Sequence, residues 1–427
     1  MTSVEKSGLR KNLLRVILLA FAGSIIYGLP YFRSYYYDAY REMYNLTNTQ
    51  MGLLGSAYGL LGVFSYIIGG VLADKFQAKK LLIFSMITTG AGGLLHLAVH
   101  DFKLLFAIYG LWGITSLLTF WPALMKIVRM QGAENEQSRA YGIFEGSRGV
   151  FNAGHLAVAT AIFAAFQAKA APHMGIRGII VFYSLAPIVV GILFIFILKE
   201  PGSNASNGGA AKRVSMKDIL SVLRMPAMWL IIIMIYTSYT FNMSSYYFTP
   251  YASNVIGAAA VTAAVLTVLA QYVRPFASTI GGFSGDKFGK GETMAVGYIL
   301  MIAGVLLMDM TSKMSGGNKM TFVIAACVLV YVGMFSNFGL YFAFIPEGGI
   351  PLELGGVAIG MASTLGYLPE VLSYIIAGKF LDKHPGFAGH HMNFMYMAAM
   401  GIIGLLTAVI WARTYGRKAK RKAREDA

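Results

Sequence analysis

The chain has 427 residues, of which 56% are hydrophobic and 13% are charged, and its mean hydropathy is +0.61. A water-soluble globule of this size needs more polar surface than this composition supplies, so the composition excludes a soluble protein and predicts a membrane protein. The net charge of +16 would suit a nucleic-acid binder. The positions of the basic residues along the chain decide between nucleic-acid binding and a charge that reflects membrane topology. The single cysteine, Cys327, excludes a disulfide framework and a cysteine metal site.

Twelve apolar segments are each long enough for a helix to cross a hydrocarbon layer ~30 Å thick. They cover approximately residues 13–36, 51–73, 81–100, 104–126, 141–165, 177–198, 227–250, 258–284, 293–311, 321–344, 355–379 and 393–414. The first segment is too long and lacks the small-residue cleavage site of a signal peptide, so it is interpreted as an uncleaved helix. The chain is therefore predicted to be an all-α integral membrane protein.

The longest polar interruption separates six predicted helices from six. It covers residues 199–226, opens with the flexible composition "EPGSNASNGGAAK" and ends in a short amphipathic helix. The predicted domains are a six-helix bundle over residues 1–198, this cytoplasmic linker, a second bundle over 227–414 and a basic tail over 415–427.

The basic residues favour one side of the membrane. With the N-terminus inside, the inner segments carry 24 of the 35 Lys and Arg residues, and the outer loops carry 7. Cytoplasmic loops of membrane proteins collect Lys and Arg, so both termini are predicted to be cytoplasmic. This distribution explains the net charge without a nucleic-acid partner.

One motif occurs twice, 212 residues apart, behind the second and the eighth predicted helix. "GGVLADKFQAKK" begins at residue 69 and "GGFSGDKFGKGE" at residue 281. The shared positions are Gly70, Asp74 and Lys75 in the first copy and Gly282, Asp286 and Lys287 in the second. A purely topological role for these charges is the alternative to a functional one, and a second copy at a matching place weighs against it.

Two six-helix halves that carry this motif resemble the major facilitator superfamily, and the resemblance covers the whole chain. It implies a fold of twelve transmembrane helices in two pseudo-symmetric bundles. It also implies that the acid and the bases of the motif pair with neighbouring helix ends and hold the cytoplasmic side closed in one state of the transport cycle. The first copy has Gln77 and Ala78 where the second has Gly289 and Lys290.

Two ionisable residues of the second half lie near the predicted middle of the bilayer. Arg274 precedes Asp286 by 12 residues and Glu370 precedes Asp382 by 12, which places both about 18 Å deep. A charge at that depth costs at least ~2.5–3.5 kcal/mol, so both residues are expected to face the interior of the bundle. Glu370 is a candidate for proton coupling, and a fixed counter-ion is the alternative.

The first half offers Arg148 and Glu145 in the fifth predicted helix. Arg148 lies roughly 13 Å deep, and Glu145 precedes it by three residues on nearly the same face of the helix. Glu145 is a second candidate for proton coupling, and a structural salt bridge between the two residues is the alternative reading.

Arg33 lies toward the outer half of the first predicted helix, among tyrosines that include Tyr31 and Tyr36. Snorkelling of Arg33 to an outer aromatic belt is the alternative to solute binding. Three arginines within the membrane favour an anionic solute, because a guanidinium meets carboxylate, phosphate or sulfonate with two parallel hydrogen bonds. The stretch "YTSYTFNMSSYY", which contains Asn242, supplies neutral donors.

Several stretches resemble the organophosphate:phosphate antiporters more narrowly. Arg33 matches the substrate-binding arginine of that group, "FWPALMKIV" its Trp-Pro pair, and "FIPEGGIPLELGGVAIGMASTLGYL" its helix 10–11 segment. "FEGSRGVFNAG" has Arg148 where the group has a histidine, and the seventh helix lacks the group's second arginine. These departures leave phosphate specificity open. Arg148 or Arg274 is expected to bind the anion in place of the missing arginine.

The sequence therefore predicts a secondary transporter that moves a small phosphorylated, carboxylated or sulfonated metabolite by alternating access. Protons or a counter-transported anion are the expected coupling partners, membrane lipid surrounds the chain, and a monomer in a bacterial inner membrane is expected. A non-transporting solute sensor of the same fold is the alternative. The absence of a Walker loop, a metal-ligand cluster and a nucleophile–base signature argues against an enzyme, a metal and a cofactor. His96 and His155 show no metal-ligand spacing and are interpreted as packing residues.

Overall fold

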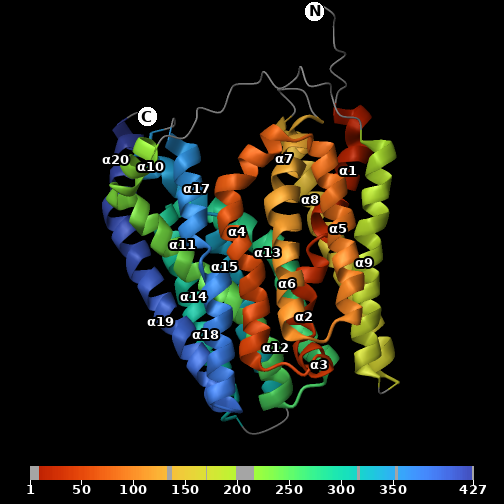
Figure 1. Ribbon diagram of the computed structural model, residues 1–427. Coiled ribbons are helices and arrows are strands. Elements are labelled where there is room, and N and C mark those ends of the chain that lie inside the picture. Colours follow the sequence, from red (N-terminus) through yellow and green to blue (C-terminus); the bar gives the residue numbers. More distant parts are fainter. Residues whose placement is uncertain are drawn as a thin grey trace, which may run out of the picture. The chain divides into compact units, whose positions relative to one another are not determined.

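The computed structural model describes residues 9–131, 137–169, 171–198, 216–314, 318–351 and 354–425. Every regular element in these ranges is a helix, as Figure 1 shows. The chain divides into two compact units. Unit 1 consists of Met1–Leu46 and Ala57–Gly209, and unit 2 of Thr47–Ser56 and Ala210–Ala427.

Unit 1 contains the first predicted spans. Its elements are α1 (Leu9–Ile25), α2 (Gly28–Tyr35), α3 (Tyr37–Met43), α4 (Asn48–Lys75, from Ala57 on), α5 (Ala78–Ala98), α6 (Phe102–Trp112), the π-helix η1 (Gly113–Phe120), α7 (Trp121–Arg129), α8 (Gln137–Gln167) and α9 (Pro172–Ile197). The first predicted span, residues 13–36, consists of two helices and not one straight helix. Its axis bends by 47° between α1 and α2. The bend sets the direction of α2, the short helix that carries Arg33.

Unit 2 follows the same helical plan. Its elements are α10 (Met216–Leu223), α11 (Pro226–Ser244), η4 (Ser245–Tyr247), α12 (Phe248–Tyr251), η5 (Ala252–Ile256), α13 (Ala260–Phe288), α14 (Lys290–Thr311), α15 (Lys319–Phe338), η6 (Tyr341–Ala343), α16 (Phe344–Glu347), α17 (Gly355–Gly366), α18 (Pro369–Lys383), α19 (Phe387–Trp411), η8 (Ala412–Gly416) and α20 (Arg417–Glu425). The predicted span 355–379 is broken just before Pro369, which starts α18 because a proline suits the first turn of a helix. The break places Glu370 in that first turn.

The beginning of α4 groups with unit 2, which the predicted domain boundaries do not include. Asp382 in α18 accepts hydrogen bonds from the backbone N–H groups of Asn48 at 2.9 Å and Thr49 at 2.7 Å. About two helical turns further on, the Ser56 hydroxyl donates to the carbonyl of Val371 at 2.6 Å. A carboxylate at the N-terminus of a helix satisfies N–H groups that lack a partner within the helix, so Asp382 caps α4 from another helix.

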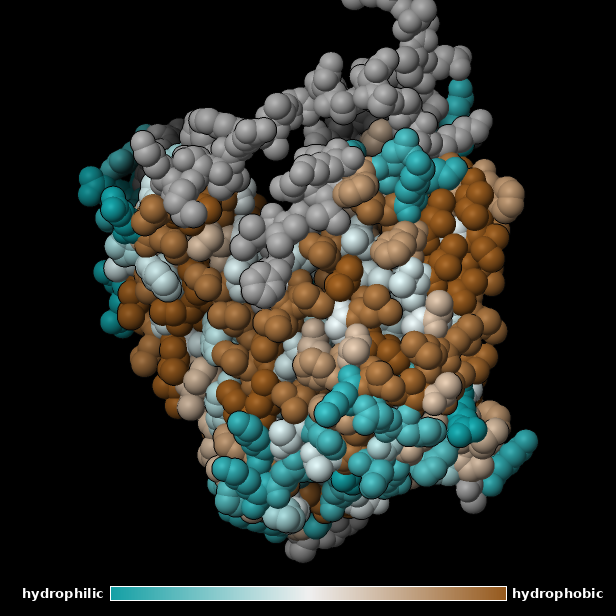
Figure 2. Space-filling model, viewed as in Figure 1, coloured by the Kyte–Doolittle hydropathy of each residue, from teal (hydrophilic) through white to brown (hydrophobic). Residues whose placement is uncertain are grey.

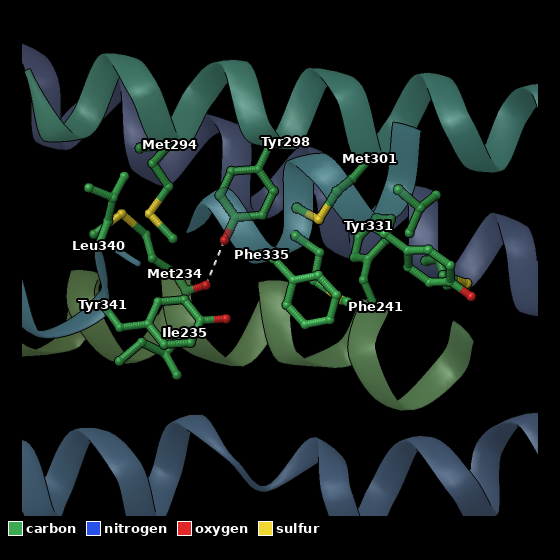
Figure 3. Close-up of a cluster of buried hydrophobic side chains, with 14 of the residues drawn as sticks. Met234, Ile235, Phe241, Met294, Tyr298, Met301, Tyr331, Phe335, Leu340 and Tyr341 are labelled. Carbon is green, nitrogen blue, oxygen red and sulfur yellow. Dashed lines mark hydrogen bonds between the residues drawn. The ribbon is translucent and has the colours of Figure 1, made fainter. Parts of the chain in front are cut away.

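Helix α14 packs at the centre of unit 2 against α15 and α19. A Cβ added at Gly333 of α15 would collide with the carbonyl oxygen of Gly297 of α14, so both positions allow a close backbone approach. Figure 3 shows the buried cluster beside this contact, where Tyr298 reaches across to α11. The Tyr298 hydroxyl donates to the carbonyl of Met234 at 2.6 Å, which satisfies a donor that is fully buried.

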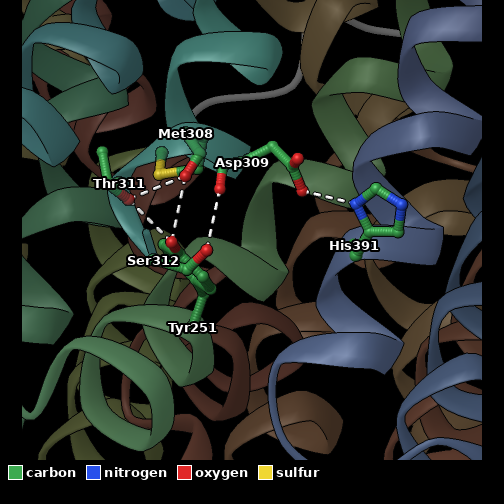
Figure 4. Close-up of polar contacts among 6 residues, drawn as sticks. All are labelled: Tyr251, Met308, Asp309, Thr311, Ser312 and His391. Carbon is green, nitrogen blue, oxygen red and sulfur yellow. Dashed lines mark hydrogen bonds and ion pairs between the residues drawn. The ribbon is translucent and has the colours of Figure 1, made fainter. Parts of the chain in front are cut away.

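The far end of α14 is held by polar contacts, which Figure 4 shows. The Tyr251 hydroxyl donates to the carbonyl of Met308 at 2.9 Å, and the Ser312 hydroxyl donates to the carbonyl of Asp309 at 2.9 Å. The Asp309 carboxylate lies 2.7 Å from Nδ1 of His391, near the start of α19. These contacts satisfy carbonyls in the last turn of α14.

The outward faces of both units are apolar. In unit 1 the exposed large side chains of α9 include Val181, Leu185, Val189 and Phe196, which recur at helical spacing, and Figure 2 shows hydrophobic side chains along α5 and α9. Ten helices of the described residues are long and apolar enough to cross a membrane, and the bent pair α1–α2 makes an eleventh candidate. The remaining predicted span, 51–73, lies in α4, where many side chains fall outside the described ones. The chain is an all-α integral membrane protein, as predicted.

Candidate solute site

Arg33 is the most deeply buried arginine among the proposed site residues. It lies on α2, and only 2% of its surface is exposed. Its guanidinium carbon is 5.4 Å from the centre of the Tyr109 ring of α6, a cation–π contact. A buried guanidinium against an aromatic face is a platform on which an anion can bind with two parallel hydrogen bonds.

The two tyrosines predicted beside Arg33 contact different helices. The ring of Tyr31 packs edge-on against Tyr58 of α4, with ring centres 5.4 Å apart. The hydroxyl of Tyr36 lies 2.9 Å from the Thr160 hydroxyl of α8, and its ring contacts Phe163 of the same helix. Tyr36 therefore ties the end of α2 to α8.

Arg148 and Glu145 form the ion pair that their spacing predicts as an alternative. Nε of Arg148 donates to a carboxylate oxygen of Glu145 at 3.2 Å, and Nη2 forms an ion pair with the same oxygen at 2.9 Å. The guanidinium carbon also lies 5.0 Å from the ring centre of Trp121, at the start of α7. Only two of the five guanidinium donors go to Glu145, whose side chain is 51% exposed, so the pair keeps capacity for an added anion.

In unit 2, Arg274 and Glu370 lie among aromatic rings. Arg274 is exposed, and its guanidinium carbon is 5.7 Å from the ring centre of Phe335. The Tyr239 hydroxyl donates to a carboxylate oxygen of Glu370 at 3.3 Å, and its ring packs on Tyr367 with centres 4.5 Å apart. Glu370 is 8% exposed and sits in the first turn of α18, where the helix dipole favours a negative charge.

Asn242 lies in the last turn of α11 and is half-buried. Its carbonyl accepts a hydrogen bond from the Ser245 hydroxyl at 2.9 Å, which helps α11 continue into η4. The structure therefore assigns a contact to its backbone, whereas its side chain remains a predicted donor.

Several aromatic partners were not predicted from the sequence. Tyr109 under Arg33, Trp121 under Arg148 and Phe335 under Arg274 all come from helices distant in the sequence. Helical spacing predicts contacts only between residues three or four apart in the sequence. Among these contacts it could therefore predict only that of Arg148 with Glu145.

The repeated motif is described in its second copy. Gly282 has open space at its Cβ position, Asp286 and Lys287 are exposed, and the Lys287 ammonium lies 5.2 Å from the ring centre of Phe288. The side chains of Gly70, Asp74 and Lys75 in the first copy lie outside the described side chains.

The charged contact of the second copy is made by Lys290. Its ammonium donates to one carboxylate oxygen of Glu347 at 2.9 Å, and the Trp411 indole donates to the other at 2.7 Å. The Glu347 side chain is 8% exposed. One carboxylate therefore links the start of α14, the end of α16 and the end of α19.

The described residues contain no group of three or more His, Cys, Asp or Glu side chains placed to hold a metal ion. The charged groups of the candidate site are therefore guanidinium and carboxylate groups against aromatic rings.

Comparison with known proteins places this arrangement in a family. The chain is 27% identical to the inner membrane protein YihN of Escherichia coli (strain K12) over 96% of this chain and 97% of the relative. It is 22% identical to the probable galactarate/D-glucarate transporter GudP of Bacillus subtilis (strain 168), over 91% and 89% of the two chains. The fold matches a bacterial homologue of the human lysosomal transporter Spinster with a TM-score of 0.75 and 15% identity, over 97% of this chain and 99% of the other. A family model described as the Major Facilitator Superfamily matches residues 12–374, so the chain belongs to this superfamily of transporters.

Proposed function

We propose that this chain is a secondary transporter of a small organic anion, which it moves by alternating access. The observation that carries the proposal is the Arg33 guanidinium, 2% exposed and held over the Tyr109 ring in unit 1. Burying a charge in a membrane protein is costly, and such residues mark solute or ion pathways. An anion bound at Arg33 lowers that cost each time the residue passes through an occluded state.

Unit 2 carries further candidate groups for solute binding in this proposal. The rings of Tyr239 and Tyr367, which pack at a tilt, offer an apolar surface, and Arg274 lies against Phe335 of the same unit. Such rings pack against the carbon skeleton of a solute, while the arginines take its charge. Glu370, bonded to Tyr239, and Glu145, bonded to Arg148, are the proposed proton-coupling or counter-ion residues.

The relatives support an anionic solute. GudP is a probable transporter of galactarate and D-glucarate, which are dicarboxylates that carry several hydroxyl groups. We propose a carboxylated, phosphorylated or sulfonated metabolite for this chain, with sugar acids as the first compounds to test. Protons or a counter-transported anion provide the driving force.

The second motif copy serves conformational change in this proposal. The contact of Lys290 and Trp411 with Glu347 joins three helix ends of unit 2 through hydrogen bonds that can open and close. Both termini are proposed to be cytoplasmic, which places this contact on the cytoplasmic side. We propose that the chain acts as a monomer.

Thermal unfolding of the purified protein in detergent tests the solute class. D-glucarate, glycerol 3-phosphate and methanesulfonate are each added to the wild type, to Arg33→Gln and to Arg224→Gln, which removes an exposed arginine after α10. A ligand at 100 times its Kd stabilises the folded state by about 2.7 kcal/mol. We expect at least one anion to stabilise the wild type and Arg224→Gln but not Arg33→Gln.

The other outcomes contradict the proposal in different ways. Equal stabilisation of wild type and Arg33→Gln would move the anion site away from Arg33. Stabilisation by none of the three anions would argue against an anionic solute. Uptake of the stabilising anion into proteoliposomes then separates a transporter from a protein that only binds.

A further inference from the structure

A chain of hydrogen bonds leads from the aromatic platform of Arg33 into the core of unit 1. The hydroxyl of Tyr109 in α6 donates to the hydroxyl of Tyr40 in α3 at 3.4 Å. The Tyr40 hydroxyl lies 2.8 Å from Nε2 of His96 in α5, and Nδ1 of His96 lies 2.9 Å from the hydroxyl of Tyr44. All four of these side chains are buried, so each bond is shielded from water.

One assignment of the protons satisfies all of these contacts. The single Tyr44 proton is donated to the carbonyl of His96 at 3.1 Å, so Tyr44 accepts from Nδ1, and Nδ1 carries the imidazole proton. A neutral imidazole then has a bare Nε2, which accepts the proton of Tyr40. Tyr40 in turn accepts from Tyr109, so all the bonds run in one direction, away from Arg33.

The surroundings of His96 hold this arrangement in place. Its ring stacks on Trp112 with centres 5.5 Å apart and meets the edge of Phe32. The titratable and charged groups around it come from every neighbouring element, and they are Tyr40 and Tyr44 beside α3, Arg33 of α2, Tyr109 of α6, His100 after α5 and Arg177 of α9. Burial and the charges of Arg33 and Arg177 favour the neutral imidazole, and an anion bound at Arg33 offsets that charge, which links proton binding at His96 to anion binding.

We propose that His96 is a proton-binding site linked through Tyr40 and Tyr109 to the anion at Arg33, which makes the transporter a proton–anion symporter. This inference rests on the proposed function, because it needs an anion at Arg33. It adds a proton acceptor that is distinct from the carboxylates Glu145 and Glu370.

The proton enters from the side of the anion. A hydronium ion in the solute site loses one proton and leaves as water, and this proton forms a new O–H bond on Tyr109. The former proton of Tyr109 passes to Tyr40, and the former proton of Tyr40 forms an N–H bond on Nε2 of His96. One proton has been added to the imidazole, each tyrosine keeps one, and no other covalent bond changes. The route ends at His96, because the Tyr44 proton is occupied by the His96 carbonyl.

This transfer reverses the chain and changes what Tyr109 offers the solute. With both nitrogens protonated, His96 donates to Tyr40, Tyr40 donates to Tyr109, and the Tyr109 proton becomes available to an anion at Arg33. The 3.4 Å bond between the two tyrosines is the longest of the chain and the easiest to reverse. By linkage, a proton that strengthens anion binding is itself bound more tightly when the anion is present.

Proton uptake on anion binding tests the inference. The purified protein in weakly buffered detergent solution is mixed with methanesulfonate, D-glucarate or glycerol 3-phosphate, and a pH-sensitive dye reports the protons taken up. Methanesulfonate cannot bind a proton in this range, so uptake with this probe belongs to the protein. We expect about one proton to be taken up per bound anion. The Kd for the anion should then fall about tenfold for each unit by which the pH is lowered, over the pH range of uptake.

Three variants locate the proton. His96→Gln keeps an acceptor for Tyr40 but cannot bind a proton, and we expect it to bind the anion with no proton uptake. Tyr109→Phe keeps the ring under Arg33 and should also lose the uptake, which guards against misfolding of the first variant. The matched control is His155→Gln, because His155 is a buried histidine bonded to Tyr183 at 3.0 Å, and it should keep the uptake.

The remaining outcomes are decisive. Anion binding without proton uptake in the wild type, or with unchanged uptake in His96→Gln, would overturn the role of His96 and leave the anion transporter intact. Binding of no probe to any variant would instead contradict the proposed function. Nitrogen-15 NMR of labelled histidines checks the resting direction, since a neutral His96 protonated on Nε2 would overturn the order of the bonds.

Discussion

The two units treat their arginines differently. Unit 1 buries Arg33 over Tyr109 and backs that ring with tyrosines and a histidine, whereas unit 2 leaves Arg274 exposed against Phe335 and buries the carboxylate of Glu370. A buried cation costs more than an exposed one, so Arg33 gains more from a bound anion than Arg274 does. The comparison therefore favours unit 1 as the unit that binds the charge of the solute.

The packing of the helices, in contrast, is similar in the two units. In unit 1 a Cβ at Gly90 of α5 would collide with the carbonyl oxygen of Ser184 of α9, and in unit 2 a Cβ at Gly333 would collide with Gly297. Both units bring pairs of helices together through glycine, so the contrast lies in the polar side chains that the helices carry.

Replacing these glycines should have the largest effect. We expect Gly90→Leu and Gly333→Leu each to lower stability by at least about 1–3 kcal/mol, because a side chain must push two helices apart. Thermal unfolding in detergent measures the loss, with Gly360→Leu as control, since no atom lies within 4 Å of its added Cβ. If only one unit were sensitive, the shared scaffold would be ruled out.

Substitution of the arginines should reduce anion transport more in unit 1 than in unit 2. Arg33→Lys keeps the charge but loses the planar fork, so we expect the rate of anion uptake into proteoliposomes to fall at least about tenfold, equivalent to 1.4 kcal/mol. Arg274→Lys should reduce it less than about threefold, because an exposed side chain can adjust. A larger loss for Arg274→Lys would place the solute charge in unit 2.

The ion pairs predict a difference in the opposite direction, with the larger loss of stability in unit 2. Glu347→Gln leaves the Lys290 ammonium without its counter-charge in a site where the acid is 8% exposed, so we expect a loss of about 1.5–3 kcal/mol. Glu145→Gln in unit 1 removes a side chain that is 51% exposed and should cost less than about 1 kcal/mol. Chemical unfolding of both variants measures the difference, and equal losses would mean that burial does not control these pairs.

The sequence predicts the helices better than the contacts between them. A long apolar run requires a helix in lipid, so the spans follow from local composition, and the Arg148–Glu145 pair follows from helical spacing. The 47° bend before α2 and the capping of α4 by Asp382 depend on neighbouring helices. The hydrogen bonds of His96 need three helices to be in place, so its expected role in packing did not extend to a link with Arg33.

The smallest expected effect compares the two ends of α14 in unit 2. Lys290 at its start contacts a buried acid, whereas Asp309 at its end pairs with His391, whose side chain is 45% exposed. Water solvates His391 when the pair is lost, so Asp309→Asn should lower the free energy of unfolding by only about 0.2–1 kcal/mol.

A double-mutant cycle with His391→Gln isolates this interaction, because Tyr251 and Ser312 keep their bonds to the backbone of α14 in all three variants. A coupling energy similar to that of Lys290 and Glu347 would contradict the solvent argument. The Asp309–His391 contact would then stabilise the packing of α14 against α19 as much as the contact of Lys290 and Trp411 with Glu347 does at the other end of these helices.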